Sequence, residues 1–161
     1  MRKLIFLLSA LALLAGVNYT IYQREQLLTS GRTILLELAP VDPRSLMQGD
    51  YMALRFKVAM DAFRAKDLKD GELVVKIATD GVATFARFND ATPLASDEAL
   101  LRYRIRNQQP KLASNAFFFE EGHAQDYAKA RYGAFRVSPS GEAILVSLHG
   151  EDRARLGALP R

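Results

Sequence analysis

The chain has 161 residues, which is enough for one domain with a single hydrophobic core, and no second domain is expected. It contains no cysteine, which excludes disulfides, thiolate catalysis and cysteine-ligated metals. The formal charge is +4, but removing Arg2 and Lys3, which precede an apolar segment, leaves 20 of the 22 basic residues against 18 acidic ones. This near balance gives little support to a nucleic-acid partner, and none is expected.

Residues 4–22 carry no charged side chain, and a helix of these 19 residues would be roughly 28 Å long, close to the hydrocarbon thickness of a bilayer. We expect a retained transmembrane anchor. The alternative is a cleaved signal peptide, but the clean small-x-small site at Ala10–Ala12 comes too early for cleavage. Arg2 and Lys3 favour a cytoplasmic N-terminus of residues 1–3, which places the rest of the chain outside.

After the anchor, residues 23–31 predict a helical stalk that ends at Gly31. Residues 32–150 then predict a β-rich domain, beginning with a strand over Thr33–Leu38. From Tyr51 to Met60 apolar and mixed positions alternate, which predicts a second, longer strand.

The next elements are predicted from turn residues and alternation. Asp80-Gly81 is typical of a type I′ hairpin turn between two strands. The tail, residues 151–161, is charged and is expected to fray. The predicted elements are strands over Leu73–Thr79, Val82–Asn89, Ala99–Arg106 and Ala116–Glu120, a short helix over Gly122–Tyr132, and a last hairpin of Phe135–Ser138 with Ala143–Leu148.

Together these elements indicate a mainly β protein of the α+β class. We expect an N-terminal transmembrane helix followed by a small antiparallel β-barrel or sandwich with one short helix.

Two sequence blocks resemble a known family. The segment Gly49-Asp50-Tyr51-Met52-Ala53-Leu54-Arg55-Phe56, and a later block with Phe118 to Gly122, Tyr127, Arg131 and Tyr132, resemble the GDYXXLXY-motif proteins. Phe56 stands where that motif has a tyrosine. The resemblance implies a small protein anchored in the bacterial inner membrane, with a periplasmic domain of no established activity. It also implies a multi-pass membrane protein as partner, because members occur beside, or fused to, such proteins.

The signature allows two interpretations. In the first, a polar corner docks on a partner and presents Asp42, Arg44, Gly49, Asp50 and Tyr51. In the second, the same turn is a structural brace, with Gly49 supplying backbone freedom and Asp50 accepting backbone hydrogen bonds. The residues with a purely structural role are expected to be Leu54, Phe56, Glu121, Gly122, Tyr127, Arg131 and Tyr132.

Arg102, Arg104 and Arg106 fall on one face of a predicted strand, roughly 6.6 Å apart. Such a row could meet anionic lipid headgroups or a glycan. The competing interpretation is a solvated edge strand that its charges protect from aggregation.

No pattern for catalysis stands out. Ser45 with Lys57 would be the pair for a membrane-tethered Ser–Lys hydrolase, but the surrounding motif is missing. His123 with Glu120, Glu121 and Asp126 is more typical of a solvated helix start than of a metal site. We therefore expect a non-enzymatic accessory protein with no cofactor, metal or small-molecule substrate, whose partners are a multi-pass membrane protein and membrane lipids.

Overall fold

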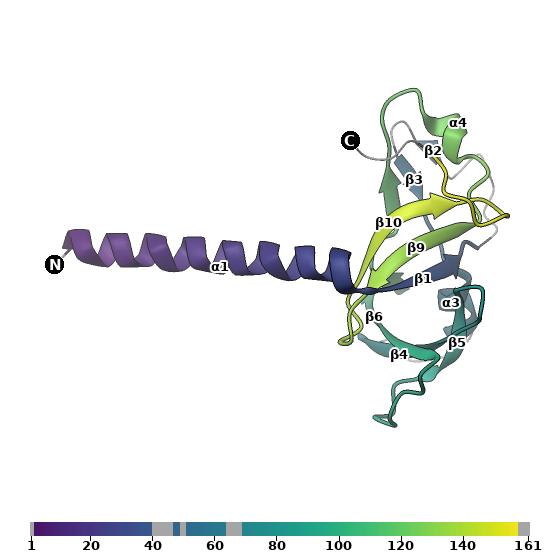
Figure 1. Cartoon of the computed structure of the whole chain (residues 1–161), viewed down its shortest axis with the longest axis horizontal. Coiled ribbons are helices and arrows are strands. Elements are labelled where there is room, and N and C mark those ends of the chain that lie inside the picture. The colour runs from purple at the N-terminus through teal and green to yellow at the C-terminus, as the bar shows by residue number, and fades with distance from the viewer. Residues whose placement is uncertain (1, 40–46, 49–50, 64–68, 158–161) are drawn as a thin grey trace.

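The computed structural model describes residues 2–39, 47–48, 51–63 and 69–157 (Figure 1). Helix α1 (Arg2–Ser30) covers the predicted anchor and stalk without a break and projects from the domain as a single rod. Within the described residues, Lys3–Ser30 is the one helix long and apolar enough to cross a membrane. Its side chains from Lys3 to Gln26 are exposed, so nothing in the described part of the domain covers the apolar surface of the anchor.

The helix joins the domain through a close contact at Gly31. The Gly31 N–H donates to the Leu27 carbonyl at 3.0 Å, and Arg136 Nη1 donates to the Gly31 carbonyl at 2.9 Å. A Cβ at position 31 would overlap the Leu27 carbonyl oxygen and lie 3.2 Å from Cβ of Arg136. Leu27 is buried here, so the last turns of α1 pack on the domain. The predicted stop at Gly31 is confirmed, and its cause is close packing.

The domain is a curled seven-stranded sheet in the order β10-β9-β1-β5-β4-β6-β7 (Figure 1). The turn between β9 and β10 meets β6, where the Arg102 N–H donates to the Gly141 carbonyl at 2.8 Å, so the sheet nearly closes into a barrel. The strands are β1 (Arg32–Glu37), β4 (Gly71–Ile77), β5 (Val82–Phe88), β6 (Glu98–Arg106), β7 (Gln109–Leu112), β9 (Tyr132–Val137) and β10 (Ala143–His149). The predicted β-rich class is confirmed, with a barrel as its form.

One strand pair is parallel, which differs from the antiparallel sheet that we expected. Strand β1 lies between two hairpins and pairs antiparallel with β9 but parallel with β5. Because β1 enters from the membrane helix and is not itself part of a hairpin, its direction is fixed by that entry and not by a tight turn.

The predicted strand over Tyr51–Met60 is wrong in its second half. Strand β3 covers only Tyr51–Ala53, and Lys57–Ala62 forms helix α3. Val58 and Ala59 are buried against the barrel, whereas Met60, which the alternation had placed with the apolar set, is 56% exposed. Residues 57–62 have alanine at two of six positions, so this segment is compatible with a helix as well as with a strand. It forms a helix because that conformation buries the face at positions i, i+1 and i+4.

A small lobe lies beside the barrel. It consists of the three-stranded sheet β2 (Met47–Gln48), β3 and β8 (Ala116–Phe118), together with helix α4 (Ala124–Tyr127). The predicted helix over Gly122–Tyr132 is therefore only one turn long. It ends because the Arg131 N–H is already paired with the His149 carbonyl at 2.8 Å, and Tyr132 begins β9.

The turns differ in type from the prediction. The β4–β5 hairpin has a three-residue loop: the Gly81 N–H donates to the Ala78 carbonyl at 2.9 Å, and Gly81 alone has a positive φ, of 83°. This is a type I turn with a glycine bulge, not a type I′ turn. A two-residue turn with positive φ at both positions occurs instead at Asn107-Gln108, where it starts the unpredicted strand β7.

The tail expected to fray, residues 151–161, is described only as far as residue 157, and this part has backbone partners in the barrel. The chain turns back after β10, and the Leu156 N–H donates to the Leu148 carbonyl at 2.8 Å. An isolated bridge also joins Arg155 to His149. Backbone pairing therefore holds this segment against the end of the barrel.

Candidate functional site: a hollow between the two family blocks

The signature segment runs from the lobe into the barrel core. Leu54 and Phe56 are each 2% exposed, and the Phe56 ring meets Phe135 edge-on at 5.3 Å between ring centroids. The Leu54 N–H donates to the Asn115 carbonyl at 2.7 Å, which fixes the segment beside the start of β8. These contacts are those of a brace between the lobe and the barrel.

The second block forms part of the same lobe. The Tyr127 ring lies between Phe117, at 4.9 Å, and Phe119, at 5.5 Å, measured between ring centroids. Arg131 ties the block to the barrel through its backbone, because its carbonyl accepts from the Leu38 N–H at 2.8 Å. The remaining predicted structural residues lie nearby: Glu121 and Gly122 in the turn before α4, with φ of 85° at Gly122, and Tyr132 half-buried at the start of β9.

Between the two blocks lies a hollow of about 910 Å³, which we call the distal hollow because Leu38 and Ala39, at the far end of β1 from the membrane helix, line it. Its lining includes the buried side chains of Met52 and Leu54 from the signature segment. Its charged residues are Arg55, Lys129, Arg131, Glu151 and Asp152, all of them exposed. A hollow of this size with an apolar base and a charged rim can hold a ligand or a short segment of another chain.

The lobe carries an aromatic pair made of the half-buried Tyr51 and the exposed Phe118. Phe118 is 73% exposed, and its ring lies 5.8 Å from that of Tyr51, centroid to centroid. Alternation along β8 produces this arrangement, because Phe117 and Phe119 turn inward to Tyr127 and leave Phe118 outward. Sequence reasoning had included Phe118 only as part of an aromatic block and had not separated it from its neighbours.

The other predicted partner-binding residues cannot be placed with this pair. Asp42, Arg44, Gly49 and Asp50 lie outside the described residues, as does Ser45.

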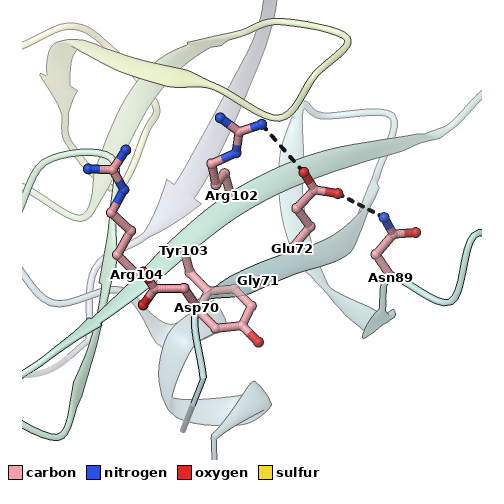
Figure 2. Close-up of a pocket in the computed structure, with 7 residues that line it drawn as sticks. All are labelled: Asp70, Gly71, Glu72, Asn89, Arg102, Tyr103 and Arg104. Atoms are coloured by element: carbon pink, nitrogen blue, oxygen red, sulfur yellow. Dashed lines mark hydrogen bonds and ion pairs between the residues drawn. The ribbon is translucent and has the colours of Figure 1, made fainter.

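The arginine row lies on β6, and Figure 2 shows the hollow beside it. Strand β6 pairs with β4 on one side and with β7 on the other, so it is not the edge strand that the charge-protection interpretation assumed. Two of the three arginines have acidic partners: Arg102 lies 3.6 Å from Glu72 and 3.5 Å from Glu142, and Arg106 lies 3.6 Å from Asp70. These carboxylates lower the positive charge that the row presents to an anion.

The hollow in Figure 2 has a volume of about 390 Å³ and is built from ordinary surface contacts. Glu72 accepts a hydrogen bond from Asn89 at 2.8 Å, and Tyr103 lies buried beneath Gly71. Burial raises the pKa of Tyr103, and the nearby Asp70 carboxylate raises it further. The phenol therefore stays protonated and contributes no charge to this face.

Lys57, half of the hydrolase pair considered from the sequence, is held by an acid. Its Nζ lies 3.1 Å from Glu37, and this hydrogen bond raises the pKa of Lys57. A lysine that serves as a general base needs the opposite change, a pKa lowered by desolvation.

The predicted acidic cluster around His123 forms one contact of note. His123 Nδ1 lies 2.8 Å from Asp126 Oδ2, and this hydrogen bond raises the pKa of His123. In the part of the chain that the structure describes, no three histidine or carboxylate side chains are grouped so that they could hold a metal ion.

We expect Asp126→Asn to lower the pKa of His123 toward its ordinary value of 6.5. The pair should stabilise the turn below pH 6.5 and lose its effect as the pH rises through the raised pKa of His123. An NMR titration of the histidine ring protons measures this. An unchanged His123 curve would show that the contact with Asp126 is not formed in solution.

The fold and the hollow define a class of protein: a single apolar helix that carries a small β-barrel domain with a lobe on its side. The family model described as "GDYXXLXY protein" matches residues 13–148, and the chain belongs to this family. Comparison with curated proteins and with solved structures finds no match.

Proposed function

We propose that this chain is a non-enzymatic, single-pass accessory protein of the bacterial inner membrane, whose periplasmic domain docks onto a multi-pass membrane partner. The observation that carries the proposal is the aromatic pair of Tyr51 and Phe118. An aromatic side chain that is 73% exposed contributes nothing to the barrel core, and exposed aromatics on rigid elements are typical of protein interfaces.

The position of the lobe also favours a partner within the same membrane. Figure 1 shows the lobe to one side of the axis of α1, so it overhangs membrane beside the anchor, where a neighbouring membrane protein would lie. Arg2 and Lys3 before the apolar segment support the outward orientation of the domain. The contact at Gly31 holds the domain on its helix, which limits the directions in which the lobe can face.

The test is native co-purification from detergent-solubilised membranes, with mass spectrometry, for the wild type and Phe118→Ser. We expect the wild type to retain a multi-pass protein and the variant to lose most of it, because truncating an aromatic at the centre of an interface typically costs about 2 kcal/mol or more of binding free energy. Circular dichroism checks that the variant is folded.

The matched control is Val146→Ser, which changes a 40% exposed apolar side chain on β10, a strand of the barrel sheet and not of the lobe. It should retain the partner. Recovery of the wild type without any multi-pass protein, or equal recovery with Phe118→Ser, would count against the proposal.

A further inference from the structure

We infer that the distal hollow binds an extended, acidic and partly apolar segment of the docking partner. This assignment rests on the proposed function and names the chemistry that the partner would supply. It begins from three cations at the hollow: Arg55 from the signature segment, and Lys129 and Arg131 from the second block.

These cations differ from six others on the domain surface, which have acidic partners. Arg87, Arg102, Arg106, Arg153, Lys57 and Lys76 each lie within 4.0 Å of a carboxylate. By contrast, none of Arg55, Lys129 and Arg131 forms an ion pair with another described residue. With three such cations against the two carboxylates of Glu151 and Asp152, the hollow keeps an excess of positive charge, which attracts a group of opposite charge.

The position of the hollow argues against lipid headgroups as the source of that charge. Residues 23–31 add roughly 13 Å of helix beyond the membrane segment, and β1 adds roughly 20 Å of extended chain. Figure 1 shows β1 leading away from α1. Charges on a bilayer act over about 8 Å at physiological salt, so the occupant must reach the hollow from a polypeptide that extends out of the membrane.

The lining distinguishes an acidic polypeptide from a uniform polyanion. Met52, Leu54 and Ala39 give the hollow an apolar base, which an occupant without apolar groups cannot use. Glu151 and Asp152, on the turn after β10, also line it and would repel a chain of phosphates. An extended peptide can place carboxylates near the three cations and apolar side chains on the base, because its successive side chains alternate in direction.

The experiment measures binding of a short fluorescein-labelled peptide of alternating leucine and glutamate to the full-length chain in a neutral detergent. We expect saturable binding that weakens as salt is added, and weakens roughly tenfold in Arg55→Gln/Lys129→Gln/Arg131→Gln. A leucine–lysine peptide and inorganic polyphosphate are the comparison probes, and both should bind more weakly.

Two further variants test the position of the site. Lys69→Gln/Arg104→Gln/Lys111→Gln removes the same charge from the β4, β6 and β7 side and should leave the affinity within about twofold of wild type. Glu151→Gln removes a repelling carboxylate and should strengthen binding. Absence of binding by the wild type, an equal loss in both triple variants, or preference for polyphosphate would overturn the assignment.

The outcomes separate this assignment from the proposed function. If the peptide does not bind while Phe118→Ser still abolishes co-purification, docking stands and the hollow is not its acidic-segment site. If the peptide binds but no multi-pass protein co-purifies, the hollow recognises an acidic segment from another source, and the proposed function fails.

Discussion

Replacing Phe56 by alanine is expected to lower the free energy of unfolding by about 3–5 kcal/mol. Phe56 is 2% exposed and ends the family signature, and its ring packs edge-on against Phe135. A Cβ built on Gly133 would lie 3.3 Å from the Phe56 ring, so the strand opposite is already as close as a glycine allows and cannot move in to fill the cavity. The loss in free energy of unfolding therefore includes most of the cost of the unfilled cavity, in addition to the lost transfer free energy of the ring.

The measurement is equilibrium urea unfolding of the full-length chain, followed by tyrosine fluorescence. Phe118→Ala is the matched control, because it removes the same ring from a 73% exposed position and should change the stability by less than about 0.5 kcal/mol. Similar losses in the two variants would mean that the signature does not anchor the lobe to the core. The two variants also distinguish the two interpretations of the signature region. A substitution in a structural brace lowers the free energy of unfolding, whereas a substitution in a recognition surface weakens partner binding.

Local patterns predicted much of the barrel. The alternation in β6 and the glycine-containing turns before β5 and β10 placed those strands within a few residues, because each pattern reports a contact between neighbours in sequence. The apolar segment and Gly31 likewise predicted the helix and its end. In each case the determining interaction lies within one element or one turn.

Long-range contacts produced the differences. Residues 57–60 alternate like a strand but belong to helix α3 (Lys57–Ala62), because the barrel interior buries one helical face with Val58 and Ala59. The helix expected over Gly122–Tyr132 is cut short by the pairing of Arg131 with His149. In both cases the interacting group lies outside the local stretch of sequence that suggested the element. Local patterns therefore could not predict the type of the first element or the end of the second.

The candidate site shows the same limit. Sequence reasoning named Tyr51 and Arg131, but it did not bring Arg55 and Lys129 to the same hollow, because they lie more than 70 positions apart in the chain. The arginine row was easier to see, since its spacing is local. Its acidic partners on β4 and before β10 were not, and they change how the row should be interpreted.

Substituting Leu11→Arg together with Leu14→Arg is expected to remove the protein from membranes. Both leucines are exposed on α1, near the middle of the uncharged segment, and nothing in the domain shields them. An arginine at the centre of a membrane helix costs about 2.5–3.5 kcal/mol on insertion scales, so two should exceed the gain from the remaining apolar residues. The measurement is the fraction that stays with membranes after an alkaline carbonate wash.

Leu28→Arg is the control for the charge itself. Leu28 is exposed on the same helix but lies in the stalk, beyond the uncharged segment, so this variant should remain in the membrane fraction. Intact-mass analysis of the wild type separates a retained anchor from a cleaved leader, since cleavage would yield a chain without residues 4–22. A wild type recovered in that shortened form, or a double-arginine variant that resists the wash, would contradict the anchor. It would also remove the geometric argument that the lobe overhangs a neighbouring membrane protein.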